Sequence, residues 1–107
     1  GDEMVVISAR CVENVFREKG TCYRIGGDEF AVLVYDPEVP DEFWPERLKE
    51  ELRNIGRGCR HRFSLSLGCS HLRNKDGSLK SMGEWKYEAD RKLYENKKKG
   101  DLKNGVY

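Results

Sequence analysis

The stretch YRIGGDEFAVLV, Tyr23–Val34, places two glycines and two acids between two short segments of strand-like composition. Gly26, Gly27 and Asp28 are compatible with a plain hairpin turn, because tight turns favour glycine for its positive φ angle and tolerate aspartate beside it. Glu29 is different, since glutamate does not favour turns and is poorly placed beside an apolar strand. The stretch therefore predicts a β-hairpin whose tip carries one acid that the turn itself does not need.

The composition bounds the class of protein. A chain of 107 residues forms one domain with a modest core. Its 20 basic and 19 acidic residues leave a net charge of only +1, whereas nucleic-acid-binding domains usually carry a basic excess. The longest apolar run, Phe30–Tyr35, is far too short to span a bilayer. We therefore expect a segment that contacts neither nucleic acid nor membrane.

The cysteines at positions Cys11, Cys22, Cys59 and Cys69 form no CxxC pair, and neither histidine stands at metal-ligand spacing from them. Scattered thiols of this kind are typical of reduced core residues in a cytoplasmic protein, rather than of a zinc site or a disulfide framework. We expect the cysteines to be structural and the chain to be cytoplasmic.

Helical and alternating hydrophobic spacing predicts an α+β order of elements. Phe30–Tyr35 is apolar on both faces, which indicates an interior strand covered by helices on at least one side. Phe63–Cys69 alternates, with Ser64, Ser66 and Gly68 on a small-residue face against which a helix could pack closely. The predicted elements are a helix from Glu3 that stops at Gly20, strands Thr21–Ile25 and Phe30–Tyr35, a helix from Trp44 to Gly56 or Gly58, strand Phe63–Cys69, a turn at Asn74–Gly77, a helix from the capping box of Ser81 and Glu84 to Gly100, and a short strand Val106–Tyr107.

Several motifs occur in one characteristic order along the chain. The opening GD is followed by RIGGDEF at Arg24–Phe30 and by an apolar strand. Further along come Ser66-Leu67-Gly68, Ala89-Asp90, Leu93-Tyr94, Lys97 and Gly100. This order resembles the GGDEF family, the diguanylate cyclases of bacterial signalling, in which the signature is followed by an SxG strand and a helix reading ADxxLYxxKxxG. The resemblance covers nearly the whole chain.

The resemblance implies a truncated GGDEF domain with a nucleotidyl-cyclase-like, ferredoxin-like sheet. Residues 1–107 would then be a partial domain that lacks the N-terminal strand and first helix, and the missing strand would lie between Phe30–Tyr35 and Phe63–Cys69. Because bare apolar edges are unfavourable, we expect another copy, a separate fragment or direct pairing of the two strands to fill the gap. Direct pairing would be parallel, since a helical crossover joins the strands.

The family joins two GTP molecules, one on each of two facing domains, into cyclic di-GMP. The resemblance therefore implies GTP as substrate, a second GGDEF domain in a homodimer, and an N-terminal sensory domain in the parent protein. It also implies Mg²⁺, which prefers carboxylate oxygens and neutralises the triphosphate.

By resemblance, the hairpin tip is the catalytic part of the site. Asp28 is a metal ligand and a catalytic residue, which we expect to project into solvent without a strong salt bridge. Glu29 assists either 3′-hydroxyl deprotonation or metal organisation. Gly26 and Gly27 allow the backbone to approach the nucleotide where a side chain would clash.

The remaining substrate-binding residues are distributed along the chain. Asp2 matches the family residue that recognises the guanine edge, and Lys97 matches one that contacts the terminal phosphates. For Arg24 two interpretations stand side by side, namely a phosphate contact and a structural ion pair.

Three departures from the family pattern bear on activity. The upstream strand with a second metal-binding Asp and the segment DxFKxxND do not occur in this sequence. Asp101 follows Gly100, where the family often has an Arg, and an acid there would repel triphosphate. The inhibitory RxxD site retains only Arg17, because Gly20 stands where the acid belongs. We therefore expect weak binding of cyclic di-GMP at this degenerate inhibitory site.

Two hypotheses follow. In the first, the chain is the C-terminal two-thirds of a diguanylate cyclase domain and is inactive by itself. In the second, it is a non-catalytic GGDEF module that binds GTP or a protein partner.

Overall fold

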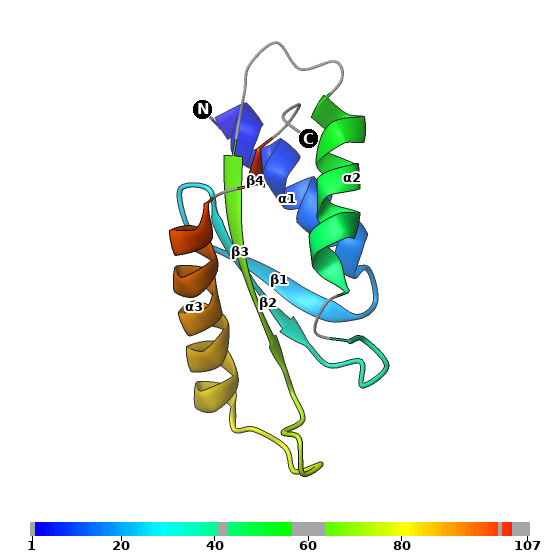
Figure 1. Ribbon diagram of the computed structural model, residues 1–107, viewed down its shortest axis with the longest axis vertical. Helices are drawn as coiled ribbons and strands as arrows, with labels where there is room; N and C mark the ends of the chain where they lie inside the picture. The colour runs from blue at the N-terminus through cyan, green and yellow to red at the C-terminus, as the bar shows by residue number, and fades with distance from the viewer. Residues whose placement is uncertain (1, 41–42, 57–63, 101, 104–107) are drawn as a thin grey trace.

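The computed structural model describes residues 2–40, 43–56, 64–100 and 102–103. These residues form three layers, with two helices on one face of a β-sheet and one helix on the other (Figure 1). None of the helices in the described ranges is both long and apolar enough to cross a bilayer. The elements are α1 (Asp2–Phe16), β1 (Gly20–Gly26), β2 (Glu29–Val34), α2 (Trp44–Gly56), β3 (Ser64–His71), α3 (Met82–Lys99) and β4 (Leu102–Lys103).

The sheet has the strand order β1-β2-β3-β4. The β1–β2 and β3–β4 pairs are antiparallel, whereas β2 and β3 are parallel, in a register that runs from Glu29 opposite Ser66 to Val34 opposite His71. The predicted α+β class is confirmed. Of the three expected ways to fill the gap between the two apolar strands, the structure shows direct pairing, which is parallel as expected for that case. The predicted strand Val106–Tyr107 lies outside the described residues, and β4 precedes it.

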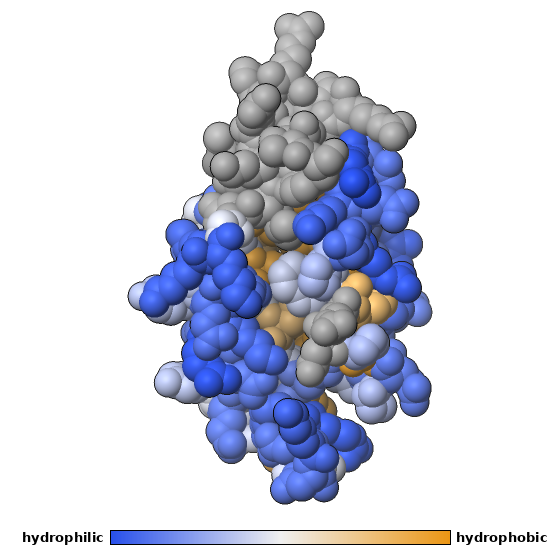
Figure 2. Space-filling view, viewed as in Figure 1, coloured by the Kyte–Doolittle hydropathy of each residue, from blue (hydrophilic) through white to orange (hydrophobic). Residues whose placement is uncertain are grey.

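Strand β2 lies in the interior of the sheet, as its composition predicts. Phe30, Val32 and Val34 belong to the apolar core under α1 and α2. Ala31 and Leu33 point the other way and pack with residues of α3. Figure 2 shows the corresponding division at the surface, where hydrophilic side chains cover α3 and α2 and apolar atoms are visible in the strip between them.

The small-residue face of β3 is where α3 packs, and this prediction is also confirmed. A Cβ atom added to Gly68 would lie 2.2 Å from the carbonyl oxygen of Ala89 and 2.4 Å from the nitrogen of Leu93. Both are backbone atoms, so the helix backbone rests directly on the strand. This contact fixes the position of α3 relative to the sheet.

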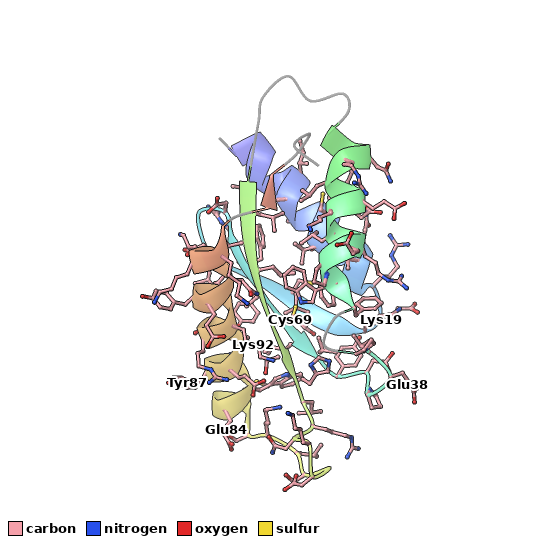
Figure 3. The ribbon with its side chains drawn as sticks, viewed as in Figure 1. Lys19, Glu38, Cys69, Glu84, Tyr87 and Lys92 are labelled. Carbon is pink, nitrogen blue, oxygen red and sulfur yellow. The ribbon has the colours of Figure 1, made fainter. Side chains whose placement is uncertain are left out.

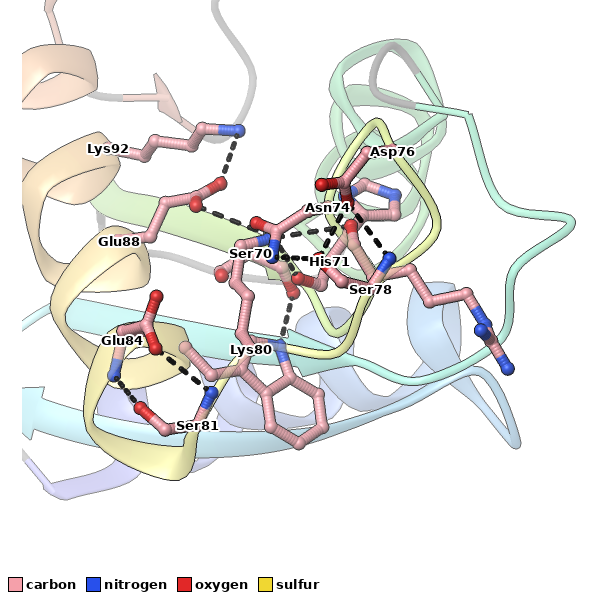
Figure 4. A network of polar contacts seen from close by, with 12 residues as sticks. Ser70, His71, Asn74, Asp76, Ser78, Lys80, Ser81, Glu84, Glu88 and Lys92 are labelled. Atoms are coloured by element: carbon pink, nitrogen blue, oxygen red, sulfur yellow. Dashed lines mark hydrogen bonds and ion pairs between the residues drawn. The ribbon is translucent and has the colours of Figure 1, made fainter.

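The start of α3 has the predicted capping box. The amide of Glu84 donates to Oγ of Ser81 at 3.2 Å, and the amide of Ser81 donates to Oε1 of Glu84 at 3.4 Å (Figure 4). One residue later, Nε1 of Trp85 donates to the carbonyl of Ser70 at 2.8 Å, which ties the first turn of the helix to the end of β3. The helix ends at Gly100, as predicted.

The predicted stop of the first helix at Gly20 is wrong. Helix α1 ends at Phe16, and the reversal is made by Glu18, which has a positive φ of 62°. Gly20 is instead the first residue of β1, where an added Cβ would lie 2.8 Å from the carbonyl oxygen of Leu33. The glycine therefore permits close approach of two strands and does not end the helix.

The three cysteines within the described residues are free thiols. Burial raises the pKa of Cys11 to about 12 and that of Cys22 to about 11, and it raises the pKa of Cys69 well above its usual value. Figure 3 shows Cys69 in the interior, while Tyr87 projects outward from α3. These thiols are protonated at neutral pH, which agrees with the predicted structural role. Cys59 lies outside the described residues.

Candidate functional site

The hairpin between β1 and β2 turns at the predicted glycines. Gly27 has a positive φ of 41°, and the pairing of the strands is irregular between Arg24 and Gly26. A Cβ added to Gly27 would meet nothing within 4 Å, so the backbone there faces open space. Nε of Arg24 donates to the carbonyl of Gly27 at 2.8 Å and closes the turn. Arg24 thus has a structural role in the hairpin.

Asp28 is less exposed than predicted. The sequence indicates a carboxylate that projects into solvent, but Asp28 is partly buried and already interacts within the chain. Its carbonyl accepts a hydrogen bond of 2.9 Å from the amide of Ser66 on β3. The reason is the direct β2–β3 pairing, which places the turn beside a neighbouring strand.

Glu29 and Lys97 meet at the mouth of the hairpin. Glu29 is the first residue of β2 and Lys97 lies in the last turn of α3, yet Nζ of Lys97 is 3.0 Å from Oε2 of Glu29. The side chain of Glu29 is 31% exposed and that of Lys97 is 48% exposed. A contact between residues 68 positions apart thus joins two motifs that the sequence only suggests belong together.

The end of α3 contains a residue that sequence reasoning missed. Nδ2 of Asn96 donates to the carbonyl of Leu67 at 2.7 Å, in a partly buried contact between the helix and β3. A single asparagine beside a run of lysines carries no periodic signal, and its partner lies 29 positions away. Only the fold makes this contact visible.

The described residues do not form a complete metal site by themselves. Within the ranges that the structure describes, no group of three or more His, Cys, Asp and Glu side chains could hold a metal ion. Asp28 and Glu29 are adjacent, but Glu29 is paired with Lys97. Because Mg²⁺ demands a near-octahedral set of oxygen atoms, the Asp28 carboxylate alone does not make a magnesium site.

The remaining predicted residues belong to other elements or lie outside the described residues. Asp2 is the first residue of α1. Arg17 donates to Oδ1 of Asn14 at 3.1 Å and lines an open cavity of about 310 Å³ that also contains Glu13. Asp101 lies outside the described residues.

Comparison with known proteins supplies the family. Residues 1–103 match the family described as "Diguanylate cyclase, GGDEF domain". Because the match covers most of the 107-residue chain, this protein belongs to the GGDEF family. Searches of curated proteins and of solved structures return no match.

Proposed function

We propose that this chain forms the GTP-binding face of a diguanylate cyclase domain, which condenses two GTP molecules into cyclic di-GMP when two such domains face each other. The observation that carries the proposal is the 3.0 Å contact between Lys97 and Glu29. The family motif gives one residue to phosphate binding and the other to the catalytic signature. Their proximity is what a single nucleotide site requires.

The roles follow from the chemistry of each side chain. Asp28 contributes a carboxylate to Mg²⁺, and that ion neutralises the triphosphate when bound. The ammonium of Lys97 binds the terminal phosphates as a compact charge. Glu29 holds that ammonium in place until the nucleotide arrives, and the nucleotide must compete with Glu29 for it.

The other predicted residues complete the proposed site. The open backbone at Gly27, together with Gly26, lets the nucleotide approach the hairpin. Asp2 is proposed to recognise the guanine edge from the start of α1. Arg24 contributes through its hydrogen bond to the turn, and a phosphate contact by its guanidinium stays a prediction.

We further propose that residues 1–107 alone make no cyclic di-GMP. The reaction needs a second domain that holds its own GTP, and each domain must complete its metal site. The family's second metal-binding Asp and its guanine-binding Asn have no counterpart in this sequence. Each lost contact of this kind reduces binding by about 1–3 kcal/mol, so two or three together weaken it by orders of magnitude.

The test is to incubate the chain with GTP and Mg²⁺ and to measure cyclic di-GMP by chromatography. We expect none from the chain alone, and we expect GTP binding to recover when a peptide with the family's upstream strand is added. Asp28→Ala is the matched control, because it removes the proposed metal ligand. Steady turnover by the chain alone that Asp28→Ala abolishes would contradict the proposed inactivity.

A second candidate function is a non-catalytic module that binds GTP or a protein partner. The observation in its favour is that Asp101 follows Gly100 where an acid would repel triphosphate. The test again uses the chain with the upstream-strand peptide added. If it binds GTP without turnover and Asp101→Arg restores turnover, then Asp101 is the residue that prevents catalysis.

A further inference from the structure

The last turn of α3 is attached to the sheet by a side chain. On the side of β2, the amide of Ser66 donates to the carbonyl of Asp28, and the amide of Leu72, directly after β3, donates to that of Val34, each at 2.9 Å. Because successive backbone groups of a strand point to opposite edges, the carbonyl of Leu67 faces away from β2. Among the residues that the structure describes, strand β4 pairs with Ser64 and Leu65. Nδ2 of Asn96 donates to the Leu67 carbonyl at 2.7 Å, just beyond the part of this edge that β4 covers.

Lys97 is held on both sides along the chain. Asn96 precedes it and is hydrogen-bonded to β3. The carbonyl of Lys97 accepts a hydrogen bond of 3.1 Å from the amide of Gly100. The next lysine takes another direction, since Nζ of Lys98 lies 4.5 Å from the centre of the Tyr94 ring. Of these two neighbouring lysines, Lys97 is the one that reaches the hairpin.

The ion pair itself is too weak to order the end of a helix. Pairs between partly exposed side chains gain little, because water screens the charges and two long side chains lose freedom. The last carbonyls of a helix also lack intrahelical partners, so the final turn frays readily. The partly buried hydrogen bond from the side-chain amide of Asn96 to the sheet is the stronger restraint at this end of α3.

We infer that Asn96 is a positioning residue of the nucleotide site: its bond to Leu67 fixes the last turn of α3, so that the ammonium of Lys97 lies against Glu29 at the hairpin. The importance of this placement for nucleotide binding rests on the proposed function. The placement itself does not, and it can be measured without any nucleotide.

The first experiment observes the Lys97 ammonium directly in the full chain. Nitrogen-15 NMR of the lysine side chains should show a resolved Lys97 signal, assigned by its loss in Lys97→Arg and shifted by Glu29→Gln. In Asn96→Ala we expect this signal to merge with those of the solvent-exposed lysines. Glu95→Ala, an exposed neighbour in the same turn, should leave it unchanged.

Two further observations separate positioning from simple loss of structure. The methyl signals of Leu93, which is buried in the middle of α3, should not change in Asn96→Ala. Asn96→Gln retains an amide donor and should restore part of the Lys97 signal. If the Lys97 signal in Asn96→Ala still stands apart and still responds to Glu29→Gln, the inference is overturned.

The second experiment adds the upstream-strand peptide to the chain and measures the affinity for GTP with Mg²⁺ by chemical-shift titration. We expect Asn96→Ala to weaken binding about fivefold, and the double variant Asn96→Ala/Lys97→Ala to bind no more weakly than Lys97→Ala alone. Additive losses would show that Asn96 acts independently of Lys97 and would overturn the inference. If the chain binds no GTP even with the upstream-strand peptide while the Lys97 signal collapses in Asn96→Ala, the proposed function fails and the positioning role stands.

Discussion

Two of the contacts that helix α3 makes with the sheet differ in kind. In its middle, Ala89 and Leu93 lie against Gly68 with no room for a single added carbon. At its end, Lys97 meets Glu29 through side chains that stay partly exposed. The first contact is between backbones, and any change in it must move the helix. The second joins two flexible charged groups, each of which can release the other and bind a ligand. The middle of α3 therefore holds the fold, whereas its end is available for chemistry.

The largest expected effect comes from breaking the backbone contact. Gly68→Ala places a Cβ at 2.2 Å from a carbonyl oxygen of α3, and backbone atoms cannot move aside as a side chain can. Because overpacking usually destabilises by 1–3 kcal/mol and this clash is severe, we expect a loss of about 3 kcal/mol or more in the free energy of unfolding. Urea denaturation followed by circular dichroism measures it.

Gly83→Ala is the matched control for that substitution. Gly83 lies in the first turn of α3, and an added Cβ would come no closer than 4.0 Å to Oγ of Ser81. Alanine is the better helix former by roughly 0.5–1 kcal/mol, so this variant should be more stable than the native chain. Equal effects of the two substitutions would mean that α3 does not rest on Gly68.

A smaller effect is expected at the start of α3. Ser81→Ala removes the acceptor for the amide of Glu84, and the loss of such a cap destabilises proteins by about 1 kcal/mol. Glu84→Gln keeps an oxygen that can accept a hydrogen bond from the Ser81 amide, so its melting temperature should be close to that of the native chain. If Glu84→Gln is as unstable as Ser81→Ala, the negative charge rather than the capping box stabilises this end.

A gain in stability is expected at the turn after α1. Glu18 adopts a positive φ of 62°, which is unfavourable for residues with a Cβ, so Glu18→Gly should stabilise the chain by roughly 1 kcal/mol. Lys19→Gly is the control, because this neighbouring position has no positive φ; glycine there adds freedom to the unfolded chain and removes the Lys19 ammonium, which lies 5.7 Å from the centre of the Phe43 ring. The account of this turn is wrong if both variants lose stability equally in urea denaturation.

The sequence predicts those features that depend on nearby residues. The hairpin, the two apolar faces of β2, the small-residue face of β3 and the capping box all follow from local spacing. The prediction for Gly20 is wrong because glycine serves equally well after a helix and where two strands approach closely. The sequence alone does not decide whether a given glycine ends a helix or allows two strands to approach closely.

The site was predicted as a set of residues but not as an arrangement. Motif resemblance places Glu29 and Lys97 in one site, yet no local pattern gives their distance. Asn96 was not found at all, since its partner Leu67 becomes a neighbour only after α3 packs on β3. The partial burial of Asp28 likewise depends on the pairing of β2 with β3.

The most direct test of the central claim compares two neighbouring lysines. Both Lys97→Ala and Lys98→Ala remove one positive charge from the last turn of α3, and both should change the free energy of unfolding by no more than about 0.5 kcal/mol. With the upstream-strand peptide present, chemical-shift titration with GTP and Mg²⁺ should show about tenfold weaker binding for Lys97→Ala and nearly native binding for Lys98→Ala, because a charged hydrogen bond contributes roughly 1.5–3 kcal/mol. Equal weakening by the two substitutions, or no dependence on either, would contradict the claim that Lys97 and Glu29 form one nucleotide site.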